Sequence, residues 1–155
     1  MASNWNRAFL PAAALLAMVP AALSGATPPD PAEHEGIIFE RQQIMERLDG
    51  DAKLVGNIVA GLAPRDQLAA ATRAVADGAR DTLEIYRLEV PGGRTRPEAW
   101  TNRADFTRKL EDFARNAEAM AKAGESGNVG AVIELMVDAM PCKACHEVYR
   151  APKQS

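Results

Sequence analysis

The C-terminal part of the chain holds two cysteines and a histidine at a spacing suited to covalent cofactor attachment. Residues Cys142, Lys143, Ala144, Cys145 and His146 form the C-x-x-C-H pattern of c-type haem attachment. Two thiols three residues apart can each form a thioether with a haem vinyl group, and the adjacent imidazole is then held over the iron. On a helix these side chains share one stripe about 100° wide. The motif predicts one covalently attached haem c, bound through Cys142 and Cys145, with His146 as an iron ligand.

Other uses of the cysteine pair are weaker for this chain. A thioredoxin-like redox pair belongs in a β-α-β context, which the sequence lacks. Zinc needs further ligands, and the only other histidine is His34, which we expect to be exposed near the start of the mature chain. A disulfide is compatible with an oxidising compartment. Haem is favoured because the chain's only two cysteines both lie in the motif.

Four amphipathic stretches must position this motif. Apolar residues recur at helical spacing in stretches that begin near Glu35, Asp66, Asn102 and Asn128. Their connections are mostly short, which favours neighbours that run in opposite directions. The sequence therefore predicts an all-α fold, an antiparallel four-helix bundle, over residues 35–152.

The fourth stretch carries the motif on its inner face. Leu135 and Ala139 precede Cys142 on the same stripe, so the motif is expected to point into the bundle. Pro141 lacks a backbone N–H and disfavours helical geometry at Met140. We therefore expect a kink or a new helix start just before Cys142.

The N-terminus has the pattern of a signal peptide, which we assign to residues 1–26. Arg7 supplies a positive charge, and residues 8–23 are apolar. The small residues 24–26 that follow suit a cleavage site after Ala26. A retained membrane anchor is the alternative, but the run is short for a spanning helix of about 20 residues. The pattern predicts export to the periplasm and no membrane segment after cleavage.

The segment after the signal peptide, residues 27–34, contains three prolines and is predicted to be a linker. The composition of the chain, 47% apolar and 25% charged, fits one globular domain. Loss of Arg7 with the signal peptide leaves 17 of the 18 basic residues beside 21 acidic ones. This acidic balance argues against a nucleic-acid partner.

The opposite face of the iron needs a residue from another helix. Met45, in the first predicted helix, can supply a thioether sulfur as a sixth ligand. The alternative is that Met45 fills the core, and Met120 is a second candidate ligand. Met136 and Met140 share a predicted helix with the histidine and cannot easily reach the opposite face.

The mature chain resembles the class II c-type cytochromes, which include cytochrome c′ and a low-spin, methionine-ligated branch. The similar segments are C-K-A-C-H-E-V-Y-R at residues 142–150, R-Q-x-x-M at 41–45 and R-P-E-A-W at 96–100. The resemblance covers most of residues 35–150. It implies a four-helix fold with a haem near the C-terminus and a homodimer through the first two helices.

The resemblance also implies roles for individual residues. The residue at the position of Met45 faces the distal side of the haem, where it binds iron in the low-spin branch but not in cytochrome c′. Arg41, one turn earlier, is then placed to pair with a haem propionate, and the alternative is a solvated surface arginine. Arg150 is implied to lie near His146, and the alternative is a cation that stabilises the last helical turn.

These observations support two main functions. The first is a periplasmic one-electron carrier with an unidentified redox partner protein. The second is a five-coordinate, cytochrome c′-like protein that binds nitric oxide. An enzyme such as a peroxidase is disfavoured because no histidine is placed for acid–base work on the distal side. A haem-free helical interaction module is the remaining alternative.

Overall fold

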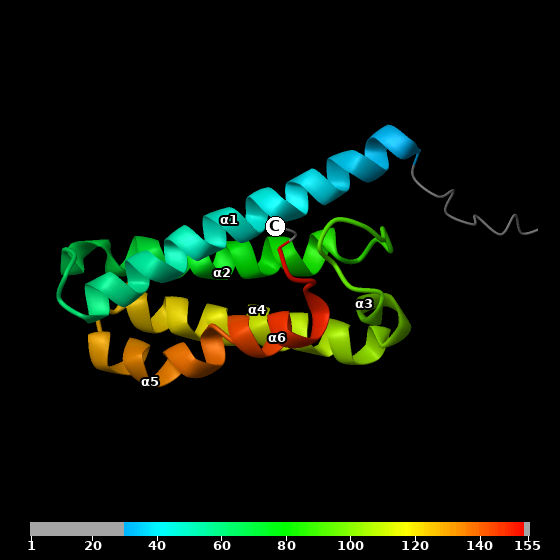
Figure 1. Ribbon diagram of the computed structural model, residues 1–155. Coiled ribbons are helices and arrows are strands. Elements are labelled where there is room, and N and C mark those ends of the chain that lie inside the picture. Colours follow the sequence, from blue (N-terminus) through cyan, green and yellow to red (C-terminus); the bar gives the residue numbers. More distant parts are fainter. Residues whose placement is uncertain (1–29, 154–155) are drawn as a thin grey trace, which may run out of the picture.

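The helices run antiparallel to one another along the length of the molecule (Figure 1). The structure, a computed structural model, describes residues 30–153. The helices are α1 (Pro31–Val59), α2 (Leu68–Ile85), α3 (Glu98–Thr101), α4 (Arg103–Glu125), α5 (Val129–Ala139) and α6 (Cys142–Tyr149), with a 3₁₀ turn at Arg65–Gln67. α1, α2 and α4 alternate in direction, and α5 continues into α6 as the fourth rod. The predicted all-α, antiparallel four-helix bundle is confirmed.

The first helix begins earlier than the sequence predicted. The carboxylate of Asp30 accepts a hydrogen bond from the backbone N–H of Glu33 at 2.9 Å. Pro31 stands at the start of the helix, where its missing N–H would have no intrahelical partner anyway. Residues 31–34 are therefore helical, and the predicted linker was wrong for this part.

Two sequence predictions fall outside the described residues. These are the signal peptide at residues 1–26 and the remainder of the linker at residues 27–29. Within residues 30–153, no helix has the length and apolarity that a membrane span requires.

The apolar stripes predicted from helical spacing form the core. Glycines allow close approach of the helices, because a methyl group at Gly124 would meet Thr72 Cβ at 3.0 Å and one at Gly78 would meet Leu48 Cδ2 at 2.6 Å. The largest fully buried apolar side chains are Val55, Ile58, Leu68, Val75, Val90, Met120 and Val132.

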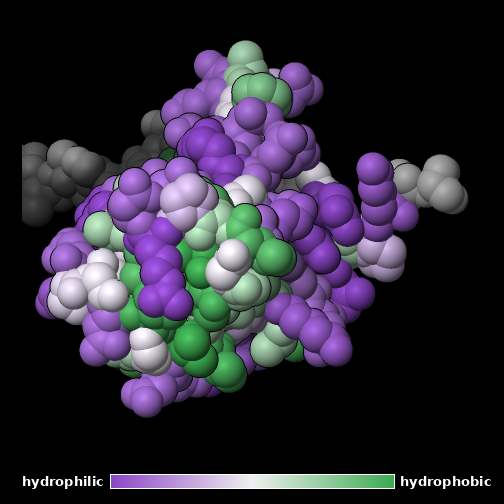
Figure 2. Space-filling model, turned by 90° about the vertical axis from the view of Figure 1, so that its left-hand side faces the viewer, coloured by the Kyte–Doolittle hydropathy of each residue, from purple (hydrophilic) through white to green (hydrophobic). Residues whose placement is uncertain are grey.

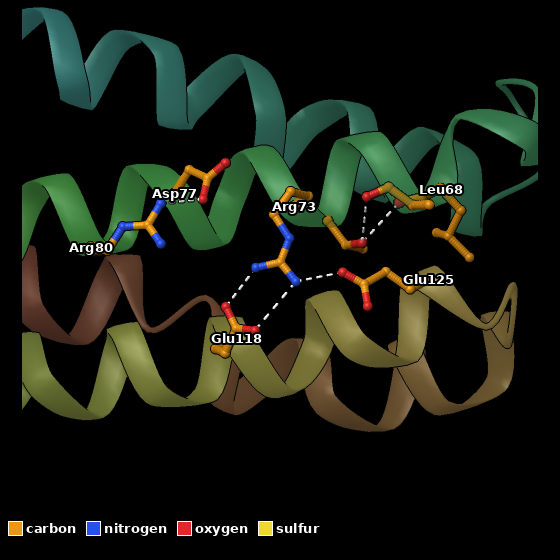
Figure 3. A network of polar contacts seen from close by, with 8 residues as sticks. Leu68, Arg73, Asp77, Arg80, Glu118 and Glu125 are labelled. Carbon is orange, nitrogen blue, oxygen red and sulfur yellow. Dashed lines mark hydrogen bonds and ion pairs between the residues drawn. The ribbon is translucent and has the colours of Figure 1, made fainter.

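A small ion network joins α2 to α4 (Figure 3). Arg73 lies 2.6 Å from Glu118 and 2.6 Å from Glu125, and its guanidinium donates to both carboxylates. The hydrogen bond from Arg73 lowers the pKa of Glu118. Because all three side chains are partly exposed, we expect the network to add little to the stability of the fold.

The fourth rod is divided just before the cysteine motif. α5 ends at Ala139, Met140 has a non-helical backbone, and α6 starts at Cys142 after Pro141. The expected new helix start just before Cys142 is confirmed. The fourth predicted stretch therefore forms two helices, α5 and α6. This break lets α6 take its own direction (Figure 1).

Apolar side chains gather on the surface at one end of the bundle (Figure 2). That end holds the connection between α1 and α2, where Leu62 is 78% exposed. Leu62 follows the end of α1 at Val59, where Gly61 adopts a positive φ of 75°.

Candidate haem site

Helix α6 presents the cysteine motif to a large space that is partly open to solvent. A cavity of about 740 Å³ is lined by Cys142, Cys145 and His146. A neighbouring cavity of about 720 Å³ is lined by Cys145 and His146 as well. Residues common to both cavities are Met45, Asp49, Thr82, Arg94, Leu110, Cys145, His146 and Arg150. The two cavities are therefore neighbouring parts of one site between α1, α2, α4 and α6.

The walls of this site match a large, flat, apolar cofactor. The first cavity is lined by Leu48, Val75, Leu110 and Phe113, and its volume falls in the range of about 300–1,000 Å³ typical of cofactor sites. Neither cysteine is in a disulfide. Among residues 30–153, no three His, Cys, Asp or Glu side chains are grouped as a zinc site would require. The donor set and the apolar walls together fit haem c.

Burial sets the protonation of the three motif side chains. Desolvation raises the pKa of both thiols, Cys142 and Cys145. Desolvation also lowers the pKa of His146, and the positive charges of Arg150 and Arg94 lower it further. His146 is therefore neutral at physiological pH, the form in which an imidazole nitrogen can bind iron.

Met45 lines the same two cavities as His146. Its half-buried side chain comes from α1 and lines both cavities, as His146 does from α6. Met120 is fully buried in the core and lines neither cavity. Met140 lines the first cavity, but it lies just before α6 in the chain. The structure thus brings together the methionine and the histidine that the sequence paired.

Arg41 is not the solvated surface arginine of the alternative interpretation, because only 4% of it is exposed. Its Nη1 donates to the Val90 carbonyl at 2.5 Å and its Nη2 to the Leu88 carbonyl at 3.0 Å. The guanidinium lies 4.3 Å from the centre of the Tyr86 ring. Arg41 lines the second cavity, and its Nε has no partner within the described part of the chain. The propionate contact stays a prediction, because Nη1 and Nη2 are used by backbone carbonyls and Nε is buried.

A contact missed by the sequence analysis closes the site. The Arg94 side chain donates to the Ala151 carbonyl, with N···O distances of 2.8 and 3.0 Å, and Ala151 N donates to the Arg94 carbonyl at 2.8 Å. Thr95 forms a β-bridge with Arg150. Residues 91–97 are rich in glycine and proline, as loops often are, but no local pattern in them indicates pairing with a segment more than fifty residues away.

Helix α6 is also fastened through Tyr149. Its hydroxyl donates to Asp105 on α4 at 2.5 Å, and its ring packs at 4.8 Å from that of Phe106. Trp100 and Tyr86 complete this aromatic cluster. Trp100 thus packs beside α6, next to the cofactor site.

Comparisons with known proteins agree with this geometry. The family model described as Cytochrome C′ matches residues 36–150. The cytochrome c′ of Alcaligenes xylosoxydans xylosoxydans is 35% identical over 63 residues, which are 40% of this chain and 50% of that protein. This match thus spans half the length of the curated relative.

Solved structures from Alcaligenes xylosoxidans share the fold over a longer range. Ferric cytochrome c prime has a TM-score of 0.70 and 25% identity, with 77% of this chain and 97% of that chain covered. The nitric oxide complex of a variant of the same protein has a TM-score of 0.71, 25% identity and the same coverage. Since the family model spans the four helices and every residue of the C-x-x-C-H motif, this chain belongs to the cytochrome c′ family, class II c-type cytochromes that carry covalently attached haem c.

Proposed function

We propose that the protein is a periplasmic one-electron carrier whose haem iron is held by His146 and Met45. The observation that carries this proposal is that these two side chains line the same cavities from different helices, α6 and α1. Haem iron with two strong axial ligands supplies one-electron chemistry without an open coordination position. A thioether opposite an imidazole also raises the reduction potential.

The chain's own residues contribute attachment, orientation and shielding. Cys142 and Cys145 are placed to hold the cofactor to α6, while the apolar side chains of Leu48 and Val75 exclude water from its surroundings. The neutral state of His146 keeps its lone pair available. The apolar part of the lining would limit the access of solvent to the cofactor and so influence its reduction potential.

A second candidate is a protein that binds a diatomic gas. It is favoured by membership of the cytochrome c′ family and by the nitric oxide complex formed by a variant of a related protein. In this case Met45 lines a crowded distal pocket without binding the iron. The same wall of α1 then limits which molecules reach the site.

Absorption spectra of ferric and ferrous protein, with and without carbon monoxide, separate the two candidates. A carrier shows a low-spin spectrum that carbon monoxide changes little. Met45→Leu then gives a high-spin spectrum and ready binding of carbon monoxide, because the sulfur is replaced at nearly constant volume. Met120→Leu is the matched control and leaves the spectrum unchanged. A high-spin wild type that binds carbon monoxide as readily as Met45→Leu contradicts the carrier and supports the gas binder.

We propose further that the protein is exported, is not an enzyme and meets protein redox partners. The peroxidase alternative lacks support from His34, which contacts the Pro91 carbonyl at 2.5 Å and lines neither cavity. A homodimer through α1 and α2 is proposed from the family resemblance, and Phe39 on α1 is 63% exposed. The mass of the protein from a periplasmic extract tests cleavage after Ala26, and sedimentation tests the dimer.

A further inference from the structure

Positive charge is concentrated in two segments of an otherwise acidic chain. The loop 91–97 and the C-terminal segment 142–153 together hold five of the 18 basic residues but only one of the 21 acidic residues. The basic residues are Arg94, Arg96, Lys143, Arg150 and Lys153, and the acidic one is Glu147. This separation of charge is a property of the surface that the haem site alone does not require.

The fold joins these two segments into one surface. Arg96 N donates to the Tyr149 carbonyl at 2.9 Å, and Ala151 N donates to the Arg94 carbonyl at 2.8 Å. The Arg94 guanidinium binds the Ala151 carbonyl as well. The two segments therefore lie together, and we call their five basic residues, each of which lines one or both of the cavities, the basic rim.

The basic rim surrounds the entrance to the haem site. Its members other than Lys153 line the first cavity together with His146, and Lys153 lines the second. The Lys143 side chain is 89% exposed, and Arg150 and Lys153 are also exposed. An approaching molecule thus meets these charges beside the cavity that His146 lines.

The acidic residues at this entrance do not cancel the rim. Asp49 lies 2.5 Å from Lys53 on its own helix and is neutralised there. Glu147 lies 3.7 Å from Lys143, a loose contact between exposed groups. Glu46 is the remaining acidic residue that lines either cavity. The basic side chains remain in excess.

We propose that the basic rim docks the acidic, carboxylate-bearing face of a protein redox partner. This inference rests on the proposed carrier function and adds the surface and the charge of the partner. Complementary charge steers encounter and orients two proteins without tight binding, which suits an electron carrier that must also dissociate. Carboxylates also pair well with the planar guanidinium groups of the rim.

An anionic membrane surface is a less suitable occupant. Membrane-binding surfaces place exposed apolar anchors beside their cations. Within the two segments, Val148 is the only large apolar side chain with substantial exposure, at 43%. Charge without apolar anchors favours a protein surface.

The first test measures oxidation of the ferrous protein by ferricyanide and by the cationic tris(phenanthroline)cobalt(III). Ferricyanide takes one electron and becomes ferrocyanide, with no bond or proton transferred, while the protein becomes ferric. We expect the ferricyanide rate to fall as ionic strength rises from about 10 mM to about 0.5 M, although the protein carries a net negative charge. A rate that rises with salt overturns the proposal.

Reversing the charge of two residues of the basic rim tests whether the rim causes this salt dependence. The double substitution Lys143→Glu and Lys153→Glu should slow ferricyanide oxidation about fivefold or more at low salt and remove its salt dependence. The matched control is Arg115→Glu with Lys122→Glu, two exposed residues of α4 that line neither cavity. It changes the net charge equally and should alter the rate less than about twofold. Equal effects of the two double variants overturn the proposal. If Lys143→Glu impairs haem attachment, Lys153→Glu alone serves.

A second readout does not depend on electron transfer. Titration with hexaglutamate should shift the backbone NMR signals of residues 94–96 and 150–153 in the wild type, and much less in the double variant. Shifts of signals from other residues overturn the proposal. It is also overturned if the protein does not bind the peptide but sediments with phosphatidylglycerol vesicles. Slow oxidation by both reagents in every variant, with peptide binding intact, means instead that the carrier function fails.

Discussion

Tyr149 on α6 donates a hydrogen bond of 2.5 Å to Asp105 on α4, and this contact ties the cofactor-bearing helix to the bundle. Burial, together with this bond, raises the pKa of Tyr149 to about 12. The same bond lowers the pKa of Asp105. Each partner therefore keeps the protonation state that maintains the contact at neutral pH.

The raised pKa of Tyr149 predicts a loss of stability in alkali. Below pH 10.0, the ordinary value, Tyr149 is protonated in both the folded and unfolded states. Between that pH and about 12 the unfolded chain loses the proton while the folded protein retains it, so the free energy of unfolding falls. Urea denaturation across this interval measures the fall, which should be smaller in Tyr149→Phe.

The lowered pKa of Asp105 predicts that the free energy of unfolding also falls as the pH is lowered into the acid range. Its pKa is lowered, so its contribution is present above the unfolded-state pKa and is lost as pH falls through the folded-state value. Asp105→Asn should flatten the acid limb of the stability curve. Parallel curves for Asp105→Asn and wild type would show that this carboxylate does not stabilise the fold.

At Gly124, helix α4 approaches α2 so closely that a larger side chain should clash. In Gly124→Ala the new methyl group overlaps the Thr72 hydroxyl and lies 3.0 Å from Thr72 Cβ, so we expect a loss of about 1–3 kcal/mol. Gly50→Ala is the matched control, because nothing lies within 4 Å of the added atom on helix α1. It should gain roughly 0.5–1 kcal/mol in the free energy of unfolding. Equal stability of the two variants contradicts the close approach.

Replacement of Arg41 should lower the free energy of unfolding whether or not the cofactor is bound. Arg41→Met retains the apolar stem but leaves the buried Val90 carbonyl without its donor, which should cost about 1.5–3 kcal/mol. Arg47→Met, at an exposed position of the same helix, should change stability by less than about 0.5 kcal/mol. Denaturation measures the cost, and faster hydrogen exchange at Val90 locates it. Unchanged hydrogen exchange at Val90 would show that other contacts hold the segment around Val90 in place.

The two cysteines predict covalent attachment. Wild-type protein should retain its haem after acid denaturation, and Cys142→Ala with Cys145→Ala should release it, because no thioether can form. Lys143→Ala is the control within the motif and should retain the haem. Mass spectrometry of the denatured chains reads the result, and a wild-type polypeptide with the mass of its amino acids alone contradicts the site.

Local patterns were sufficient for most of the fold. Apolar residues at helical spacing recur through each rod, so the faces that carry Val55, Val75 and Val132 could be identified before any contact was known. Pro141 correctly predicted a break, because proline cannot serve the helix interior. The same rule misassigned Pro31, since proline also suits the first helical turn.

Contacts between distant segments were beyond the sequence analysis. Arg41 donates hydrogen bonds to the carbonyls of Leu88 and Val90, in the segment that follows α2, and nothing near Arg41 in the chain indicates this. The pairing of Arg94 with Ala151 likewise depends on how the loop and the C-terminal segment meet. The motif residues were identifiable because their chemistry requires a fixed local spacing.

The break at Met140 and Pro141 bears on how α6 is held in place. An isolated helix of eight residues does not persist in water, so α6 depends on its attachments to the rest of the protein. Because α5 ends before the break, the last segment can detach and unfold while its neighbours stay paired. The contacts of Tyr149 with Asp105 and of Arg94 with Ala151 therefore keep the segment that carries both thiols in its helical form.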